Sequence, residues 1–264
     1  MSGRSTRQVS YANPAGSRAS TPRIEAPGRG VLVVGAGGLS CPVLSVLARS
    51  GVTRFTLVDD DRVELGNLHR QTLYDEGDVG RLKVEVAAER LVALSPFPEA
   101  LQIEPIVARL APDNALSLVR GHAVVVEGAD NFATKFLAAD AAKLCAVPAV
   151  QGGAVRFSGW ALGVLPTSGP CVRCIFEDIP RGQPETCSVA GVLGPVVGVL
   201  GALQAALAIE LLLGRTRAAG VLYSYDALGI GLRKRRVHAR RDCPLCRGDV
   251  SALDDARYEA SCEA

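Results

Sequence analysis

The sequence predicts an α/β protein with a Rossmann-like, doubly wound and mainly parallel sheet that continues into antiparallel C-terminal strands. Two patterns support this. Strands and helices alternate over residues 30–150, and a glycine-rich turn follows the first strand. Such alternation predicts a parallel sheet with right-handed crossovers. The chain has 264 residues, of which 48% are hydrophobic and 21% charged, which is enough material for a substantial buried core.

The elements of the parallel part follow one another without long gaps. Val31 to Val34 is a short, apolar, β-branched run, which predicts a buried parallel strand. Over Leu82 to Leu94 the apolar residues recur at the spacing of one helix face. The remaining predicted elements are a helix over 39–49, a strand over 53–58, a strand over 123–126, a helix over 132–144 and a strand over 147–150.

The pattern changes after Gly152. Residues 155–165 and 221–237 read as antiparallel strands around an apolar helix over 195–213. The uncharged segment 189–209 has the length of a membrane span. Four glycines and Pro195 interrupt it, however, so we expect a buried helix that begins near Pro195 and no membrane partner.

Composition divides the chain into three parts. Residues 1–29 hold five arginines, one acid and many small residues, which predicts a flexible N-terminal arm without a secretory signal. Residues 30–247 form the single predicted domain, and 248–264 form a C-terminal tail. With 29 basic and 27 acidic residues, the net charge of +2 argues against a nucleic-acid partner.

The glycine-rich turn has the features of a nucleotide site. Gly35, Gly37 and Gly38 allow close approach of a phosphate to the backbone and to the N-terminus of the next helix. Asp59 ends the second strand, where an acid commonly binds a ribose hydroxyl. Ser40 stands at the third glycine of the dinucleotide fingerprint, so this turn leaves the nucleotide unspecified.

Polar residues further along favour a polyphosphate. Arg70 is suited to binding two phosphate oxygens, and Lys83 supplies a point charge. Asn67 and Gln71 offer further hydrogen bonds. Asp130 follows a strand at the carboxyl edge of the sheet, where a carboxylate is suited to binding Mg²⁺ beside substrate phosphates.

Four of the eight cysteines form two C-x-x-C pairs, which have the spacing of zinc ligands. The pairs are Cys171 with Cys174 and Cys243 with Cys246. Four thiolates leave zinc no open position, so the predicted role is structural. Unrelated reduced thiols are the alternative, and either reading indicates the cytoplasm, where thiols stay reduced.

Together these motifs closely resemble the MoeB/ThiF family, bacterial relatives of the ubiquitin-activating enzymes, over about residues 30–247. They are the glycine turn, Leu57–Asp59, Asn67–Gln71, Asp78–Lys83, Asp130–Asn131 and the paired C-x-x-C. The resemblance implies ATP-dependent adenylation of the C-terminal Gly-Gly carboxylate of a small ubiquitin-like sulfur carrier protein. Pyrophosphate would leave, and the carrier would be ready for thiocarboxylate formation.

The resemblance also implies roles for particular residues. The three glycines would form the ATP turn, and Asp59 would hold the ribose. Asp130 would bind Mg²⁺. The phosphates would be contacted by Asn67, Arg70, Gln71 and Lys83.

The family further implies a homodimer in which Arg7, followed by Gln8, reaches the ATP of the partner subunit. Cys187 lies on a polar loop where relatives carry a cysteine that takes part in covalent sulfur chemistry. A bystander thiol is the alternative reading of Cys187. We expect the sulfur to come from a separate protein, a cysteine desulfurase or a sulfurtransferase.

Several positions depart from the family pattern. Ser40 replaces a glycine, Glu127 and Ala129 stand where relatives usually have Asp and Thr, and Val189 replaces a usual Glu. None removes an expected phosphate contact. The carrier stays open among molybdopterin, thiamin and specialised thiocarboxylate pathways.

Two other functions remain to be compared with adenylation. An NAD-dependent oxidoreductase with a structural zinc would explain the glycine turn and Asp59, but not Arg70, Lys83 or Asp130. A non-catalytic carrier-docking homologue is the other alternative. The presence of those three residues argues against it.

Overall fold

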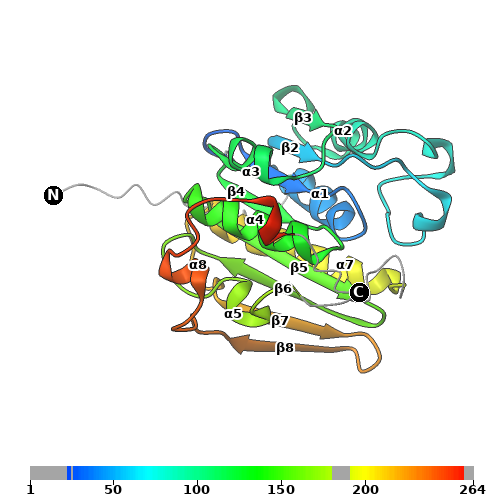
Figure 1. The fold of residues 1–264 in the computed structure, drawn as a ribbon. Coiled ribbons are helices and arrows are strands. Elements are labelled where there is room, and N and C mark those ends of the chain that lie inside the picture. Colours follow the sequence, from blue (N-terminus) through cyan, green and yellow to red (C-terminus); the bar gives the residue numbers. More distant parts are fainter. Residues whose placement is uncertain (1–22, 25, 180–190, 259–264) are drawn as a thin grey trace, which may run out of the picture.

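A computed structural model describes residues 23–24, 26–179 and 191–258, and within them eight strands form one sheet in the order β3-β2-β1-β4-β5-β6-β7-β8 (Figure 1). The first strand pairs on either side with partners that come later in the chain, as in a doubly wound sheet. The predicted fold class is therefore confirmed.

One half of the sheet is parallel. It holds β1 (Val31–Val34), β2 (Arg54–Val58), β3 (Gln102–Ile106) and β4 (Val124–Glu127). Every residue of β1 and β4 is buried, as expected for central strands covered on both faces. The helices that follow these strands are α1 (Ser40–Arg49), α2 (Lys83–Leu94), α3 (Pro112–Val119) and α4 (Phe132–Leu144).

The other half is antiparallel. Strand β5 (Ala149–Val155) pairs in parallel with β4 and antiparallel with β6 (Ser158–Val164), so it is the point where the sheet changes direction. Strands β7 (Val221–Asp226) and β8 (Gly231–Arg236) complete the sheet as a hairpin. Two short helices, α5 (Arg173–Phe176) and α8 (Pro244–Arg247), lie near its end.

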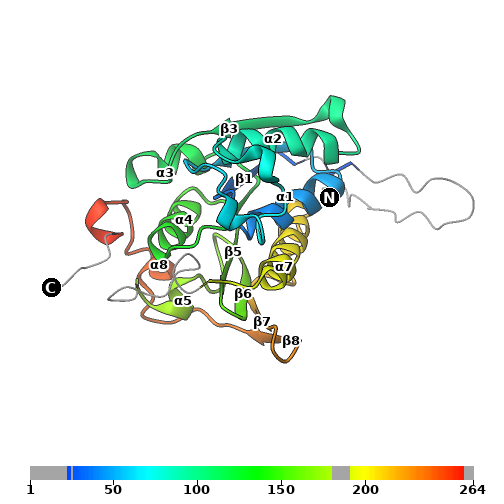
Figure 2. The same ribbon diagram turned by 90° about the vertical axis from the view of Figure 1, so that its right-hand side faces the viewer.

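Helices cover both faces of the sheet. Figure 2 shows α1 and α7 (Gly194–Leu212) on one side of the strands, and α3 and α4 on the other. Each side has its own apolar core. One includes Leu44 of α1 and Leu200 of α7, and the other includes Phe136 of α4 and Val119 of α3. The two layers fix the carboxyl ends of the parallel strands relative to each other.

The apolar segment that could be mistaken for a membrane span is α7. In the described part of the chain it alone has the length and hydropathy of a span, with a mean hydropathy of 1.9. It packs against α1, β5 and β6, and its Gln204 is fully buried. The opposite face of the helix is exposed and uncharged at Pro195, Val199, Ala202 and Ala206. This core position agrees with the expected helix.

The sequence pattern missed β3, α3, the short helices α5 and α8, and part of β5. In β3 the sequence Gln-Ile-Glu-Pro-Ile has two polar residues and a proline, which edge strands tolerate. The strand predicted over 147–150 runs instead to Val155, through Gly152 and Gly153. A Cβ atom at Gly152 would lie 2.8 Å from the Gln204 side chain, so close packing explains the glycine there.

Candidate nucleotide site and four-cysteine cluster

A cavity of about 510 Å³ opens at the carboxyl ends of the parallel strands. It lies where the strand order reverses between β1 and β4, which is the ligand position expected in an open α/β sheet. Within the described ranges, nine residues were predicted from the sequence for the nucleotide site, and all nine line this cavity. They are Gly35, Gly37, Gly38, Asp59, Asn67, Arg70, Gln71, Lys83 and Asp130.

The three turn positions are glycine for different physical reasons. Gly35 has a φ of +87°, and a Cβ atom there would lie 3.2 Å from the Ala129 nitrogen, so the fold itself requires glycine. At Gly37 and Gly38 a Cβ atom would have no neighbour closer than 3.5 Å. Both line the cavity, so their missing side chains leave space for a ligand rather than for the protein.

The Asp59 carboxylate is fixed by the backbone. One of its oxygens accepts from the Ala36 amide at 2.6 Å, and the other from the Asp61 amide at 2.7 Å. Burial raises the pKa of Asp59, and these hydrogen bonds together with the Lys83 charge oppose the rise. The carboxylate therefore ties the glycine turn to the end of β2 and still lines the cavity.

Arg70 is held beside the turn by its own segment. Its Nη2 atom donates to the Asn67 Oδ1 atom at 2.6 Å, and Asn67 Nδ2 in turn donates to Glu64 Oε2 at 3.0 Å. Gln71 is 4% exposed, and its Oε1 atom has no hydrogen-bond partner among the described residues. A buried acceptor without a partner needs an explanation, and a bound donor in the cavity would supply one.

Lys83 is the first residue of α2 and is only 4% exposed. Its Nζ atom forms an ion pair with Asp61 Oδ2 at 2.7 Å. The Asp61 side chain is 65% exposed, so it is free to leave when a stronger anion arrives. A buried ammonium facing a polar cavity is suited to binding phosphate oxygens.

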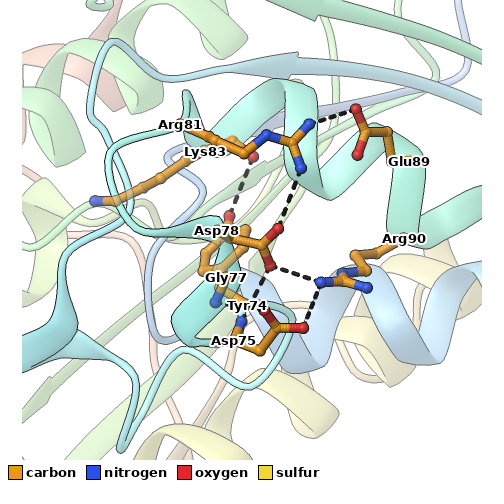
Figure 3. A network of polar contacts seen from close by, with 8 residues as sticks. All are labelled: Tyr74, Asp75, Gly77, Asp78, Arg81, Lys83, Glu89 and Arg90. Atoms are coloured by element: carbon orange, nitrogen blue, oxygen red, sulfur yellow. Dashed lines mark hydrogen bonds and ion pairs between the residues drawn. The ribbon is translucent and has the colours of Figure 1, made fainter.

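A polar network fixes the segment before Lys83 (Figure 3). Buried Asp78 accepts from Arg81 at 3.1 Å and from Arg90 at 2.6 Å. Burial alone would raise the pKa of Asp78, but the hydrogen bonds from Arg90 and the Asp75 amide outweigh it and lower the pKa. Tyr74 Oη donates to the Ala36 carbonyl at 2.7 Å, which links this segment to the glycine turn. Figure 3 shows the Lys83 side chain extending away from the network.

Asp130 follows β4 and is exposed in the cavity. It makes no hydrogen bond or ion pair with any residue in the described ranges. Asn131 next to it caps α4 by accepting from the Thr134 amide at 2.8 Å. An unpaired carboxylate in the same cavity as Lys83 and Arg70 is chemically suited to a divalent cation that also binds phosphate oxygens.

The sequence reasoning missed the role of Lys135, and it noted Glu127 only as a departure from the family. Both are buried directly behind Asp130, and their side chains form an ion pair at 3.0 Å. Burial raises the pKa of Glu127, and the Lys135 ammonium opposes the rise. A charged residue at the end of a fully apolar strand, followed eight residues later by a lysine on a helix, was the signal in the sequence.

Ser40 also departs from the family pattern, and the structure shows what it contacts. Its hydroxyl is buried and has no hydrogen-bond partner among the described residues. A Cβ atom at Gly128 would lie only 2.4 Å from this oxygen. Gly128 thus accommodates the larger residue at position 40.

A second cavity of about 700 Å³ lies over the antiparallel half. Its wall includes Phe132, Trp160 and Phe176, whose rings pack against one another at centroid distances of 5.1 and 5.8 Å. Ala129 lines both cavities, so the two meet at the turn that carries Asp130. The sequence reasoning did not identify this groove, because its residues come from five separate segments.

The four predicted cysteine ligands come together between α5 and α8. All four Sγ atoms lie within 4.8 Å of one another, and four of the six distances between them are 3.5 to 3.8 Å. A tetrahedron with Zn–S bonds of about 2.3 Å has sulfur atoms about 3.8 Å apart. The thiols are free and mostly buried, so they fit one zinc ion with no open position.

Two residues with a predicted role lie outside the described residues, namely Arg7 and Cys187. The same is true of Val189, which departs from the family pattern. Cys41 is fully buried, and burial raises its pKa to about 12, which fits a packing role rather than a reactive thiol. Cys145 is half-buried at the end of α4 and belongs to neither cavity.

The sequence matches the model of the ThiF family over residues 25–246. A sulfur carrier protein adenylyltransferase from Thermus thermophilus is 43% identical over 239 residues, which cover 88% of this chain and 87% of that protein. The SAMP-activating enzyme E1 of Haloferax volcanii is 39% identical over 235 residues, covering 88% and 86% of the two chains.

Other relatives are longer. The adenylyltransferase and sulfurtransferase MOCS3 of Mus musculus is 41% identical, and this chain spans half of its length. Among solved structures, that of E. coli MccB with MccA-N7isoASN superposes with a TM-score of 0.72 at 22% identity, over 83% of this chain and 66% of MccB. At that identity the likeness concerns the fold.

Proposed function

Since this chain belongs to the ThiF family, we propose that it adenylates the C-terminal Gly-Gly carboxylate of a ubiquitin-like sulfur carrier protein, using ATP. The observation that carries this is the single cavity in which the glycine turn, Arg70, Lys83 and Asp130 meet. Two relatives at 43 and 39% identity are named as a sulfur carrier protein adenylyltransferase and an E1 enzyme, which supports the proposal.

The reaction joins two anions, so the site must offset their repulsion. The carrier carboxylate attacks the α-phosphorus of ATP, and pyrophosphate leaves. Arg70 and Lys83 donate to phosphate oxygens and stabilise the charge that builds on them. The carboxylate is already ionised at neutral pH, so no general base is needed. This agrees with the absence of any histidine from the residues that line the described cavity.

Two metals belong to the proposal. Asp130 would hold Mg²⁺, which when bound neutralises charge on the phosphates and the leaving pyrophosphate. Asn67 and Gln71 would bind further oxygens of the nucleotide, and Asp59 would accept from the ribose. The four cysteines of the cluster would hold a structural Zn²⁺ that ties α8 to α5.

The aromatic groove gives the carrier a path to the nucleotide. It is mostly apolar, it extends over the antiparallel strands, and it meets the nucleotide cavity at Ala129. A flexible tail lying in it would bring its terminal carboxylate to the α-phosphate, which supplies the proximity that a bimolecular reaction lacks.

A homodimer is supported by α7. Its exposed face is uncharged at Pro195, Val199, Ala202 and Ala206, which leaves this face open to a second subunit. Arg7 of one subunit would then reach the ATP of the other. We further retain as proposals a covalent role for Cys187, a separate sulfur donor, a cytoplasmic location and the division into an arm, residues 30–247 and a tail.

The test is ATP–pyrophosphate exchange with a panel of carriers that end in Gly-Gly. Exchange should require a carrier, and a matched carrier that lacks the last glycine should give only background. Nicotinamide binding without ATP binding would instead favour the oxidoreductase. A folded protein that binds ATP but supports no exchange with any carrier would favour the docking homologue.

A further inference from the structure

Lys135 occupies an unusual position for a lysine. It lies in the first turn of α4, its side chain is 6% exposed, and its ammonium points into the protein. The Nζ atom contacts both Glu127 carboxylate oxygens, at 3.0 and 3.2 Å, and donates to the carbonyl oxygens of Ala129 and Gly152. Its bonds thus link β4, β5 and the turn between β4 and α4.

The Ala129 peptide is held from both sides by this pair. Its amide donates to Glu127 Oε1 at 2.6 Å, and its carbonyl accepts from Lys135 Nζ at 2.6 Å. Ala129 directly precedes Asp130, and it lines both the nucleotide cavity and the aromatic groove. A shift of this peptide would therefore move the Asp130 carboxylate and the wall between the two cavities.

Stability alone does not account for the pair. Removing two charges from water is costly, and buried ion pairs are often no more stabilising than apolar residues of the same volume. Here the surroundings are built to keep the pair in place. Gln204 donates to the Glu127 carbonyl at 2.7 Å, and Gln151 donates to the Lys135 carbonyl at 2.8 Å. These hydrogen bonds make a rigid support for the turn at residues 128–130. The Asp130 carboxylate on this turn has no partner among the described residues.

We propose that Glu127 and Lys135 are a positioning pair that fixes the turn at residues 128–130 and thereby places the Asp130 carboxylate for its work on the nucleotide. Glu127 lines neither cavity, and although Lys135 also lines the aromatic groove, this role requires no contact of either side chain with the substrate. The role rests on the proposed adenylation, and it acts through the Ala129 peptide. A shift of about 1 Å in a reacting group is enough to cost roughly 100-fold in rate.

The test compares two double variants. Glu127→Gln/Lys135→Met removes both charges and the bonds that Lys135 makes. Glu127→Asp/Lys135→Arg keeps both charges and offsets the shorter aspartate with the longer arginine side chain. ATP affinity is measured by calorimetry with and without Mg²⁺, next to the melting temperature and the kcat and KM of exchange. Asp130→Ala is the reference for a lost carboxylate.

The neutral double variant should fold and bind ATP without Mg²⁺ as the parent protein does. It should lose the affinity that Mg²⁺ adds, down to the Asp130→Ala level, and its exchange kcat should fall by about 100-fold. In the charge-conserving variant, the affinity that Mg²⁺ adds and the exchange kcat should both return to within about threefold of the parent values. A folded neutral variant with the parent's Mg²⁺ effect would overturn the proposal, because a merely structural pair leaves that effect unchanged.

If the neutral variant does not fold, Lys135→Arg alone is measured. The larger guanidinium against the full-length Glu127 should displace the turn and lower the Mg²⁺ effect, and adding Glu127→Asp should restore it. An unchanged Mg²⁺ effect in Lys135→Arg would contradict the proposal. Should no carrier support exchange by the parent protein, the proposed function fails, while calorimetry still tests the positioning pair.

Discussion

The two halves of the sheet differ in what they present at their surfaces. The parallel half places charged and polar groups around one cavity, at the ends of strands that are themselves apolar. The antiparallel half offers an aromatic groove on the sheet and a cysteine cluster at its edge. A parallel sheet collects strand ends at one edge, whereas a hairpin sheet exposes a broad face. We infer that the first half serves the nucleotide and the second half the protein substrate.

The largest effect is expected from the charged groups of the parallel half. Lys83→Ala and Asp130→Ala should each lower carrier-dependent exchange by at least about 100-fold, since each removes a group that we propose stabilises charge on the phosphates. The melting temperature should change little for Asp130→Ala, because that side chain is exposed and unpaired in the described structure.

Lys143→Ala is the matched control, because Lys143 lies at the far end of α4 and does not line the cavity where the phosphates would bind. It should leave exchange unchanged. Normal exchange by Asp130→Ala would remove this residue from the proposed site.

The cysteine cluster should affect stability rather than chemistry. Cys246→Ser removes one of the four proposed zinc ligands, so the zinc content should fall from one ion per chain to none and the melting temperature by roughly 10 °C. ATP affinity measured well below that temperature should stay near that of the parent protein, because none of the four cysteines lines the nucleotide cavity.

Cys145→Ser is the control, since Cys145 is a free thiol outside the cluster. Zinc should be measured in protein purified without chelator. An absence of zinc in the parent protein would show that the four thiols are not a zinc site.

The aromatic groove should matter for the carrier alone. Trp160→Ala removes a ring that packs on Phe176 in the groove wall, so the KM for the carrier should rise by about tenfold, a typical loss for an apolar anchor at an interface. The affinity for ATP should not change. Phe157→Ala is a matched control, because Phe157 is 45% exposed and does not line the groove. Equal effects of the two variants would argue against the groove as the carrier site.

The smallest effect is a pH dependence of stability in the parallel half. Burial, with help from the Arg29 charge, lowers the pKa of His122 below its ordinary value of 6.5, and its Nε2 atom contacts Thr56 Oγ1 at 2.9 Å. The unfolded chain therefore binds a proton more readily than the folded one. The stabilisation is fully present above pH 6.5 and decreases as the pH falls from there through the lowered pKa.

The melting temperature should accordingly fall by about 2 °C between pH 7 and the acid side of this window, which corresponds to less than about 1 kcal/mol. His122→Gln should flatten this part of the curve, whereas His238→Gln, at an exposed position, should not. An unchanged slope in His122→Gln would assign the pH dependence to other groups.

Much of the parallel half could be predicted from the sequence, because its signals are local. The apolar run of β1, the glycines of the turn and the helix face of α2 lie within short segments, so the cavity and its nine residues followed from motif order. Strand β3 was missed because it lies at the sheet edge, where polar residues and Pro105 hide the strand pattern.

The remaining features depend on contacts between distant segments. The ion pair of Glu127 with Lys135 joins β4 to α4, and the groove brings Phe132, Trp160 and Phe176 together from three elements. No spacing within one segment encodes the groove, and the ion pair has only a weak signal, a glutamate at the end of an apolar strand with a lysine eight residues later. The cysteine cluster is an intermediate case, since each C-x-x-C pair is local, while the meeting of the two pairs required the fold.

The most direct measurement is the intact mass of a Gly-Gly-ended carrier after incubation with this protein, ATP and Mg²⁺. We expect the carrier to gain one adenylyl group at its C-terminal carboxylate and to lose it when pyrophosphate is added. Lys83→Ala should leave the carrier unmodified. An unmodified carrier across the whole panel, with protein that is folded and binds ATP, would contradict the claim that the two halves cooperate in adenylation.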